Sequence, residues 1–418
     1  MYTTQSLTEL IERLLEAERV LPAHRELAKN VGTLSDFFNR LKKPLPTSGK
    51  EHLYMSDANM RAAYLAYFFP VNCIKTYLLL RRIAGEGLLP PKSSATPLKI
   101  LDFGCGPGSA ALGAVYYFAG ADREGSGDSD GNDSDDGSGG DGGGESIPES
   151  AVPELYLVDQ STAVLETAVR LLKKSELPLQ IHAMGRIPDE TKFDLILALN
   201  VLNENTDDEA KRILNLLKNC LSPTGRLLIA EPALRETARQ LIALRDQLLS
   251  DAELTLLWPC RHCSSCPGIL TENDWCHGTE VWDRPDWIAQ IDREIGNKKE
   301  RLNYAALLYT LSAAASFSAS GATGICTGEN ALESYITTSD AIWRVVSDPI
   351  IERGKRVLYL CGGPSGERIR TTALERHLSE ANRDFFAAQR YDLLHIEGTL
   401  EKKGDGFRLS PETKATLV

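Results

Sequence analysis

The sequence lacks any uninterrupted run of about 18 or more apolar residues, the length that a membrane-spanning helix needs. Its first 20 residues also lack the basic segment followed by an apolar segment that marks a secretory signal. They have instead the alternation of apolar and acidic residues that is typical of an amphipathic helix. These absences predict a chain that neither spans a membrane nor is secreted, and we expect a cytoplasmic location.

An excess of positive charge is also missing, because the formal net charge is -12. Ten carboxylates and one arginine lie within residues 122–149, so this segment carries -9 and the rest of the chain only -3. Local basic patches on the remainder can therefore still bind a polyanion such as RNA. The same segment consists mostly of Gly, Ser and Asp, and we predict a disordered acidic insertion over residues 121–150.

At 418 residues the chain is long enough to bury more than one hydrophobic core. Apolar residues recur at helical spacing through the first part, which predicts a helical N-terminal region over residues 1–90. Strand and helix patterns then alternate, which predicts an α/β domain over residues 91–318 with a parallel sheet covered on both faces. The last part is rich in glycine and strand-like segments, and predicts a small, mainly β domain over residues 319–418.

A predicted strand runs directly into a glycine-rich turn, Asp102-Phe103-Gly104-Cys105-Gly106-Pro107-Gly108. Glycines let the backbone approach a ligand without obstruction by a Cβ atom. The next predicted strand ends in Asp159, whose carboxylate is placed to accept hydrogen bonds from ribose hydroxyls. Because the turn has no GxGxxG pyrophosphate motif, it favours S-adenosylmethionine over a dinucleotide. A tight turn in a nucleotide-free α/β domain is the alternative.

The candidate cofactor-binding residues follow the ends of the first four predicted strands. They are Asp102, Gly104, Cys105, Gly106, Gly108, Asp159, His182, Ala183 and Asn200, with His182 and Ala183 expected near the adenine. Asn200 is also the candidate catalytic residue, since it stands where such enzymes face the methyl acceptor. The sequence has neither an NPPY tetrad nor a cysteine nucleophile there, so the acceptor atom is not identified. Glu204 and Asn205 fit helix capping equally well.

Nine cysteines in a chain without an export signal predict reduced thiols that are free to bind metal. Four of them, Cys260, Cys263, Cys266 and Cys276, fall within 17 residues and define a predicted Cys-rich metal-binding insertion over residues 258–300. Thiolates are soft ligands that suit zinc or iron-sulfur centres. Cys361 supplies one thiol more than four. With His262 and His277 nearby in sequence, a zinc site with mixed ligands stays open.

These motifs together resemble the Rsm-type family of mitochondrial and bacterial small-ribosomal-subunit methyltransferase-like proteins. The segments that carry the resemblance are LDFGCGPGSA, LNVLNE, LLIAEPALRETARQLIALRDQLL, WPCRHCSSCPG, DWCH and RVVSDPIIERGKRVLYLCGG. The resemblance implies a Rossmann-like, S-adenosylmethionine-dependent methyltransferase core. It also implies a four-iron four-sulfur cluster on Cys260, Cys266, Cys276 and Cys361, with Cys263 as the alternate ligand and zinc as the alternative metal.

The partner that the resemblance implies is the small ribosomal subunit with its ribosomal RNA. Two functions follow as hypotheses. The first is methylation of that RNA. The second is a non-catalytic assembly or translation factor in which the cofactor and metal sites are structural or redox-sensing.

Two further groups of side chains bear on these hypotheses. Five basic residues near Cys361 fit either phosphate contacts or an ordinary solvated face, and they are Arg353, Lys355, Arg356, Arg368 and Arg370. Four tryptophans are predicted to pack around the metal centre and shield it from solvent, and they are Trp258, Trp275, Trp282 and Trp287.

Overall fold

The computed structural model describes residues 2–21, 25–40, 55, 57–91, 96–124, 152–249, 251, 253–312, 340–362 and 366–418. By its internal contacts the chain forms two compact units. The first unit is Met1–Ala198 with Trp282–Glu300, and the second unit is Leu199–Val281 with Arg301–Val418. The predicted α/β domain over residues 91–318 is therefore divided between them. The first four residues of the predicted acidic insertion, 121–124, belong to a helix. The rest of it lies outside the described residues, and the next described stretch begins at residue 152.

The N-terminal part of the first unit is helical, as its periodicity predicts. Helix α1 begins with a capping box in which the Ser6 amide donates to Thr3 Oγ1 at 3.1 Å. Its apolar stripe is buried, and the Tyr116 hydroxyl binds Ser6 Oγ at 2.8 Å, which joins α1 to α6. The helical elements are α1 Thr4–Ala17, α2 Arg25–Arg40, α4 Ala58–Ala63, the π-helical turn η1 Tyr64–Phe68, α5 Phe69–Gly85 and α6 Ser109–Glu124.

One of these helical stretches, Ala58–Gly85, is long and apolar enough to cross a membrane by length and composition. In the protein, 83% of its most apolar window is buried. It packs on α1 and α6, and its π-helical turn contacts α2 and α10 (Asp286–Ile295). Its apolar composition is thus accounted for by burial in the core of the first unit.

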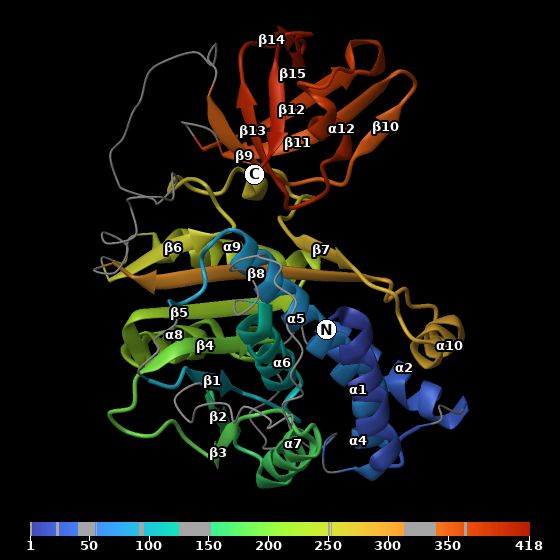
Figure 1. Ribbon diagram of the computed structural model, residues 1–418, viewed down its shortest axis with the longest axis vertical. Helices are drawn as coiled ribbons and strands as arrows, with labels where there is room; N and C mark the ends of the chain where they lie inside the picture. Colours follow the sequence, from blue (N-terminus) through green and yellow to red (C-terminus); the bar gives the residue numbers. More distant parts are fainter. Residues whose placement is uncertain are drawn as a thin grey trace, which may run out of the picture. The chain divides into compact units, whose positions relative to one another are not determined.

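The first unit also holds the parallel strands that the sequence predicts. They are β1 Lys99–Phe103, β2 Glu154–Val158, β3 Gln180–Met184 and β4 Phe193–Leu199. Strand β1 pairs in parallel with both β2 and β4, and β2 pairs in parallel with β3. Helix α7, Thr162–Lys174, packs on β3 (Figure 1). The interior strands are apolar along their length because both of their faces are covered.

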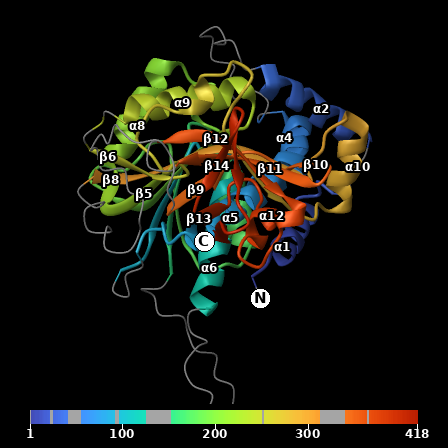
Figure 2. The ribbon, with the colours of Figure 1, turned by 90° about the horizontal axis from the view of Figure 1, so that it is seen from above.

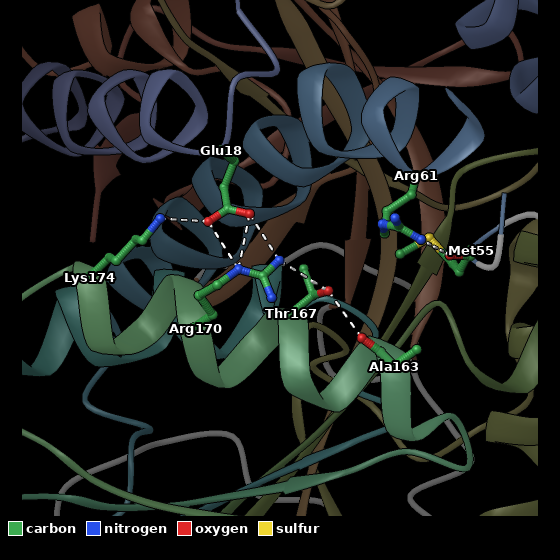
Figure 3. A network of polar contacts seen from close by, with 7 residues as sticks. All are labelled: Glu18, Met55, Arg61, Ala163, Thr167, Arg170 and Lys174. Atoms are coloured by element: carbon green, nitrogen blue, oxygen red, sulfur yellow. Dashed lines mark hydrogen bonds and ion pairs between the residues drawn. The ribbon is translucent and has the colours of Figure 1, made fainter. Parts of the chain in front are cut away.

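A network of polar contacts ties the end of α1 to α7 (Figure 3). Glu18 accepts hydrogen bonds from Arg170 Nη2 at 2.9 Å and from Lys174 Nζ at 2.8 Å. The hydrogen bond from Arg170 is the main cause that holds the pKa of Glu18 below its usual value. The N-terminal helices are thereby fastened to the α/β part of their own unit.

The second unit contains the remaining strands of the larger sheet, together with α8 Asp207–Asn219 and α9 Arg235–Leu248. The strands are β5 Leu221–Pro232, β6 Leu254–Trp258, β7 Gly278–Val281 and β8 Arg301–Leu311. The hydrogen-bonded order of the sheet is β3-β2-β1-β4-β5-β8-β6, with β7 paired to β8. The order from β3 to β5 is Rossmann-like. The expectation of a parallel sheet does not hold at β8, which is antiparallel to β5, β6 and β7.

A second sheet occupies the end of the chain, and we call residues 340–418 the C-terminal barrel. Its elements are β9 Ala341–Val345, β10 Ile350–Glu352, β11 Lys355–Gly362, β12 Glu367–Leu374, the short η5 Glu375–His377, α12 Arg383–Ala387, β13 Leu393–Glu397, β14 Leu400–Lys403, β15 Gly406–Leu409 and β16 Lys414–Leu417. Strand β12 pairs antiparallel with β11, which lies beside it in Figure 2, and in parallel with β15. Trp343, Leu358, Ile369 and Phe385 lie in its buried core.

The sheet of the C-terminal barrel closes on itself. Its order is β14-β15-β12-β11-β9-β13-β16, so β14 and β16 stand at its two ends. Yet β14 continues β13 across Gly398, and β16 follows β15 along the chain. The two continuous segments pair antiparallel twice, as β14 with β15 and as β13 with β16. The ends of the sheet are therefore joined, and five long strands form a closed barrel.

Candidate functional site

The glycine-rich turn of the first unit adopts the conformation that its glycines allow. Gly104, Gly106 and Gly108 all have positive φ, at 67°, 53° and 84°. Such angles are unfavourable for residues with a Cβ atom. A Cβ atom at Gly106 would meet nothing within 4 Å, so this backbone faces open space at the point where a ligand can approach. The turn leads directly into α6, whose first amides lack partners within the helix and favour an anionic group.

Asp159 is held against this turn. Its Oδ2 accepts from the Gly106 amide at 3.0 Å, and its Oδ1 accepts from the Ser161 amide at 2.9 Å. Each carboxylate oxygen has a second lone pair. The side chain can therefore position the turn and still accept hydrogen bonds from the hydroxyls of a ribose.

Asp102 has a different role from the one predicted. It is 1% exposed, and its Oδ2 accepts from the Ala111 amide in the first turn of α6 at 3.0 Å. Burial raises the pKa of Asp102 to about 7. Its carboxylate supports the turn from beneath, because it caps the helix that the turn enters. Cys105 is also buried, and burial raises its pKa, which fits a packed residue and not a nucleophile.

His182 does not lie where the sequence placed it. It lies within β3, opposite Tyr156 of β2, and its ring stacks on that tyrosine with ring centroids 4.4 Å apart. Its Nε2 lies 4.0 Å from Glu154, at the opposite end of β2 from Asp159. The imidazole thus points away from the edge of the sheet where the turn lies. Ala183 is within the same strand and paired with Leu157, and Met184, whose carbonyl accepts from the Asp159 amide, ends the strand.

Asn200 follows β4 directly and has a left-handed backbone, with φ of 58°, that asparagine tolerates better than most residues. The segment after it is held by Glu231 of β5, which is 2% exposed and accepts from the Leu202 amide at 2.8 Å. Asn205 donates to the Val201 carbonyl at 2.7 Å, so its amide serves the local turn. The Oδ1 of Asn203 is buried and has no hydrogen-bond partner among the described residues.

The second unit brings four free cysteines together around one cavity. Cys260, Cys266, Cys276 and Cys361 all line it, although Cys361 comes from β11 of the barrel. The cavity has about 540 Å³ of space between protein atoms, part of it open to solvent. Burial raises the pKa of Cys266 to about 12 and also raises the pKa of Cys276 and of Cys361. A metal or cluster bound there must displace their protons.

Arginines of helix α9 hold the segment between β6 and β7, residues 259–277, which we call the cysteine-rich loop. The sequence motifs did not indicate this feature. Arg239 donates to the carbonyls of Ile269 at 3.0 Å and of Thr271 and Asp274 at 2.9 Å. Arg245 is 1% exposed and donates to the carbonyls of His262 and Ser264 at 2.7 and 2.6 Å. Its Nε lacks a hydrogen-bond partner among the described residues, and the side chain lines the cavity. The sequence feature that could have pointed to this role is the pair of arginines, Arg239 and Arg245, within RETARQLIALRDQLL.

Two further polar groups contact the thiols. The hydroxyl of Tyr391 lies 3.4 Å from Cys276 Sγ, and His262 Nε2 lies 3.6 Å from Cys361 Sγ. Burial lowers the pKa of His262 to about 4, so its ring is neutral near pH 7. His262 is therefore a neighbour of a thiol, as is Tyr391, which no sequence motif indicated.

Cys263 differs from the other four cysteines of this region. It is disulfide-bonded, whereas Cys260, Cys266, Cys276 and Cys361 are free. Its sulfur is therefore not available as the alternate ligand, and the expectation that every thiol is reduced is wrong at this position. Among the described residues, no group of three or more His, Cys, Asp and Glu side chains is arranged to hold a metal ion.

The tryptophans and basic residues separate into different roles. Trp258 is fully buried beneath the Arg344 guanidinium, and Trp275 stacks on His277. Trp282 and Trp287 belong to the first unit, where Trp287 donates to the Ala66 carbonyl at 3.1 Å. None of the four tryptophans is among the described residues that line the cysteine cavity, so their packing around a metal centre stays a prediction.

Two of the five basic residues serve the structure itself. Arg368 pairs with Asp274 of the cysteine-rich loop, and Arg356 donates to the Ala388 carbonyl at 2.8 Å. Lys355 and Arg370 share the exposed Glu352, at 2.7 and 3.6 Å. Arg353 is exposed at the turn between β10 and β11.

A sequence model of the family described as mitochondrial small ribosomal subunit Rsm22 matches residues 147–391. This match spans more than half of the chain. The chain belongs to the Rsm22 family. The match includes the segment after β4, helix α9 and all four free cysteines of the cavity, and it begins after the glycine-rich turn. No curated protein matches the chain significantly.

Several solved structures are similar to this Rsm22-family chain, and two of the three given next are named as methyltransferases. PKMT2 from Rickettsia typhi is 19% identical, with a TM-score of 0.26, over 43% of this chain and 31% of its own length. This chain therefore spans about a third of that protein. Magnesium protoporphyrin IX methyltransferase from Synechocystis PCC 6803 with bound SAM is 12% identical, with a TM-score of 0.32, over 67% of this chain and 96% of its own. An S-adenosylmethionine-dependent methyltransferase from Clostridium acetobutylicum ATCC 824 is 10% identical, with a TM-score of 0.26, over 77% of this chain and 76% of its own length.

Proposed function

We propose that this protein binds S-adenosylmethionine and acts with the small ribosomal subunit and its RNA, and that it carries a four-iron four-sulfur cluster. The observation that carries the proposal is the cavity of the second unit, where four free cysteines from distant parts of the sequence converge. Membership of the Rsm22 family supports the ribosomal partner.

The turn of the first unit fits S-adenosylmethionine. Its open backbone at Gly106 accommodates a ligand, and the two occupied oxygens of Asp159 retain lone pairs for ribose hydroxyls. The start of α6 favours the carboxylate of the methionine part. We withdraw His182 from the binding set because its ring points to the other end of β2. Met184 and Gly185, where β3 ends, replace it as the residues next to the adenine.

We favour a cluster over a single zinc ion in the cysteine cavity. Tetrahedral zinc with bonds of about 2.3 Å needs four sulfurs within about 4 Å of one another, and the described side chains contain no group arranged to hold one ion. A four-iron cluster is larger and holds its thiolates farther apart. Cys260, Cys266, Cys276 and Cys361 would be its ligands, since Cys263 is already bonded.

The surroundings of the cavity suit an anionic group. Four thiolates bring negative charge into a buried site, which is costly without compensation. Arg245 places a fully buried guanidinium beside them, although its Nη1 is also paired with Asp246 at 2.6 Å, and Arg344, 3% exposed, lines the same cavity. The unpaired Nε of Arg245 is, among the described residues, a donor available to a sulfur atom. The protein thus supplies positive charge and a hydrogen bond at the position that the cluster would occupy.

S-adenosylmethionine supplies an electrophilic methyl group when it is bound. The chain's own part in a transfer is to hold the turn open through Asp102 and Asp159 and to orient the segment after β4 through Glu231. Asn200 and Asn203 are the polar side chains of this segment that we assign to the methyl acceptor. The buried Oδ1 of Asn203 would accept a hydrogen bond from the bound acceptor molecule.

The proposal is tested by analysis of protein purified without oxygen. We expect about four irons and four sulfides per chain, a broad absorption band near roughly 400 nm, binding of S-adenosylmethionine by calorimetry, and co-sedimentation with small ribosomal subunits. One zinc per chain without colour would contradict the cluster. Failure to sediment with the subunits would contradict the partner.

A second candidate is an assembly factor that binds the same groups without transferring a methyl group. The engagement of Asn205 and Glu231 in holding the strand end favours it, because these polar groups serve structure. The two candidates differ in one measurement. Transfer of a labelled methyl group from S-adenosylmethionine to RNA of immature subunits supports the enzyme, and binding without transfer supports the factor.

A further inference from the structure

The topology of the C-terminal barrel points to a ligand class. The first long strand, β9 with β10, is followed by β11 and β12 in antiparallel hairpins. Helix α12 lies between the third and fourth long strands, and the fifth closes the barrel in parallel to the third through β12 and β15. This is the arrangement of an OB-fold. Barrels of this type bind oligonucleotides on the second and third strands and on the loops beside them.

On this barrel those elements are β11, β12, the turn after β10 and the turn between β14 and β15. Tyr359 of β11 stands opposite Arg370 of β12, and neither belongs to the buried core of the barrel. The Arg370 side chain is 29% exposed. The turn after β10 carries Arg353 and Lys355, and the turn after β14 carries Lys403, which is 54% exposed. Gly406, beside this last turn, packs against Arg370, so both turns border one face.

We propose that this face of the barrel binds single-stranded RNA. Its cations would contact phosphates. The Arg368 guanidinium lies over the Tyr359 ring, 5.2 Å from the ring centroid, so a base would stack on the opposite face of that ring. Arg408 of β15, which pairs with Thr372 of β12, extends the same row of cations. Exposed Ile350 of β10 stands opposite Val357, on the same face as Tyr359, and adds apolar contact area there. The cysteine-rich loop covers the other end of this face at Gly366 and Arg368, which sets its limit.

The choice of RNA over DNA rests on the proposed function. The single strand itself rests on the barrel, since a duplex does not expose its bases to a stacking side chain. Because binding would rest on contacts between cations and phosphates, we expect it to depend on salt. Glu352 and Glu401 lie among the cations and reduce their net charge.

The experiment measures binding of the full chain to a fluorescein-labelled oligouridylate of about twelve nucleotides, a length within the range of one OB-fold. The test variant is Arg353→Glu with Lys403→Glu, because both side chains are on exposed turns. The control is Arg383→Glu with Lys414→Glu, which changes the net charge equally but alters the β13–β16 side, where Arg383 begins α12. Melting temperatures check that each variant folds.

We expect the test variant to bind at least about tenfold more weakly, with a salt slope reduced by about one for each cation that no longer meets a phosphate. The control should stay within about twofold of the wild-type chain. Equal weakening by both pairs would overturn the assignment of this face, and absence of RNA binding in the wild type would overturn the proposal. Competition by a duplex or an oligosaccharide as strong as by the single strand would overturn the ligand class.

Iron content, S-adenosylmethionine binding and co-sedimentation with small subunits are measured on the same preparations. A chain that sediments with the subunit but does not bind the oligonucleotide would contradict the barrel proposal and leave the proposed function intact. A chain that binds the oligonucleotide through this face but not the subunit would do the reverse.

Discussion

Single residues differ in how closely their position follows their sequence motif. Asp159 stands beside Gly106 because β1 and β2 pair in parallel, so that their carboxyl ends meet at one edge of the sheet. Arg245 reaches the cysteines only because α9 packs on β5 and on β8, and residues of β8 line the same cavity. Both residues act through hydrogen bonds and charge, so conservative substitutions separate their roles from packing.

Replacement of Arg245 by Gln removes the buried positive charge beside the thiols. We expect the purified variant to retain less than about half of the wild-type iron, and its remaining cluster to be reduced at a potential lower by on the order of tens of millivolts, because reduction adds negative charge. Arg239→Gln is the matched control, since Arg239 binds the same loop by carbonyl contacts but does not line the cavity. Equal iron loss in both variants would show that loop anchoring alone matters.

Replacement of Asp159 by Ala removes the acceptor beside the turn. We expect S-adenosylmethionine to bind about tenfold or more weakly in calorimetry, because the hydrogen bonds to a charged group disappear. Glu154→Gln alters a carboxylate at the opposite end of the same strand and should leave the affinity within about twofold. A similar loss in both variants would contradict the assigned site.

At the scale of elements, two contacts join helices, strands and loops that are distant in the sequence. The hydrogen bonds that Glu18 accepts from Arg170 and Lys174 join the end of α1 to α7. Gly366, at the start of β12, contacts the cysteine-rich loop. Neither contact follows from the pattern of either element alone, because each depends on a partner far away in the sequence.

The hydrogen bonds that Arg170 and Lys174 donate to Glu18 predict that the stability of the folded chain depends on pH. Because the pKa of Glu18 is lowered in the folded chain, its contribution is present above the unfolded pKa and is lost as the pH falls through the lowered value. Glu18→Gln should therefore lower the melting temperature near pH 7 by about 2 °C, with a smaller difference in acid. Glu16→Gln, on the exposed side of the same helix, should change neither. A difference that persists unchanged below about pH 3 would contradict this account.

Gly366 allows the β11–β12 hairpin to meet the loop. It has φ of 69°, and a Cβ atom there would lie 2.7 Å from His262 Cγ. Gly366→Ala should push the loop away and lower the iron content. Gly404→Ala is matched, because Gly404 has φ of 62° with nothing within 4 Å of a Cβ atom. It carries the same backbone cost without the contact, so equal iron content in the two variants would argue against a role of this contact.

At the scale of the whole molecule, the second unit combines the end of the larger sheet with the barrel. Cys361 is the residue through which the barrel contributes a thiol to the cavity. The cluster would then cross-link the barrel to the end of the larger sheet, and its loss should lower the stability of both parts.

Cys361→Ser should lose iron to the same extent as Cys276→Ser, although the two residues lie in different parts of the chain. Both variants should also melt at a lower temperature than the iron-loaded wild type, because bound metal stabilises the folded chain. Cys220→Ser changes a free cysteine of the same unit that does not line the cavity, and should keep its iron. Full iron content in Cys361→Ser would remove the barrel from the ligand set.

Periodicity and local chemistry predicted much of this protein. The helical start, the parallel strands β1 to β4, the turn at Gly106 and the strands of the barrel all follow from patterns of neighbouring residues, where short-range sterics and burial of one face dominate. The family also followed from short motifs around the cysteines. These features are encoded locally, so the sequence by itself determined them.

Tertiary structure decided the rest. The antiparallel direction of β8, the closure of the barrel and the direction of the His182 ring depend on pairing between distant strands, which local patterns do not encode. The convergence of Cys361 on the other three thiols, and of Arg245 on all four, likewise arises only when α9, β8 and β11 pack around one cavity. The physical reason is that burial and charge compensation are properties of the folded surroundings and not of the residue.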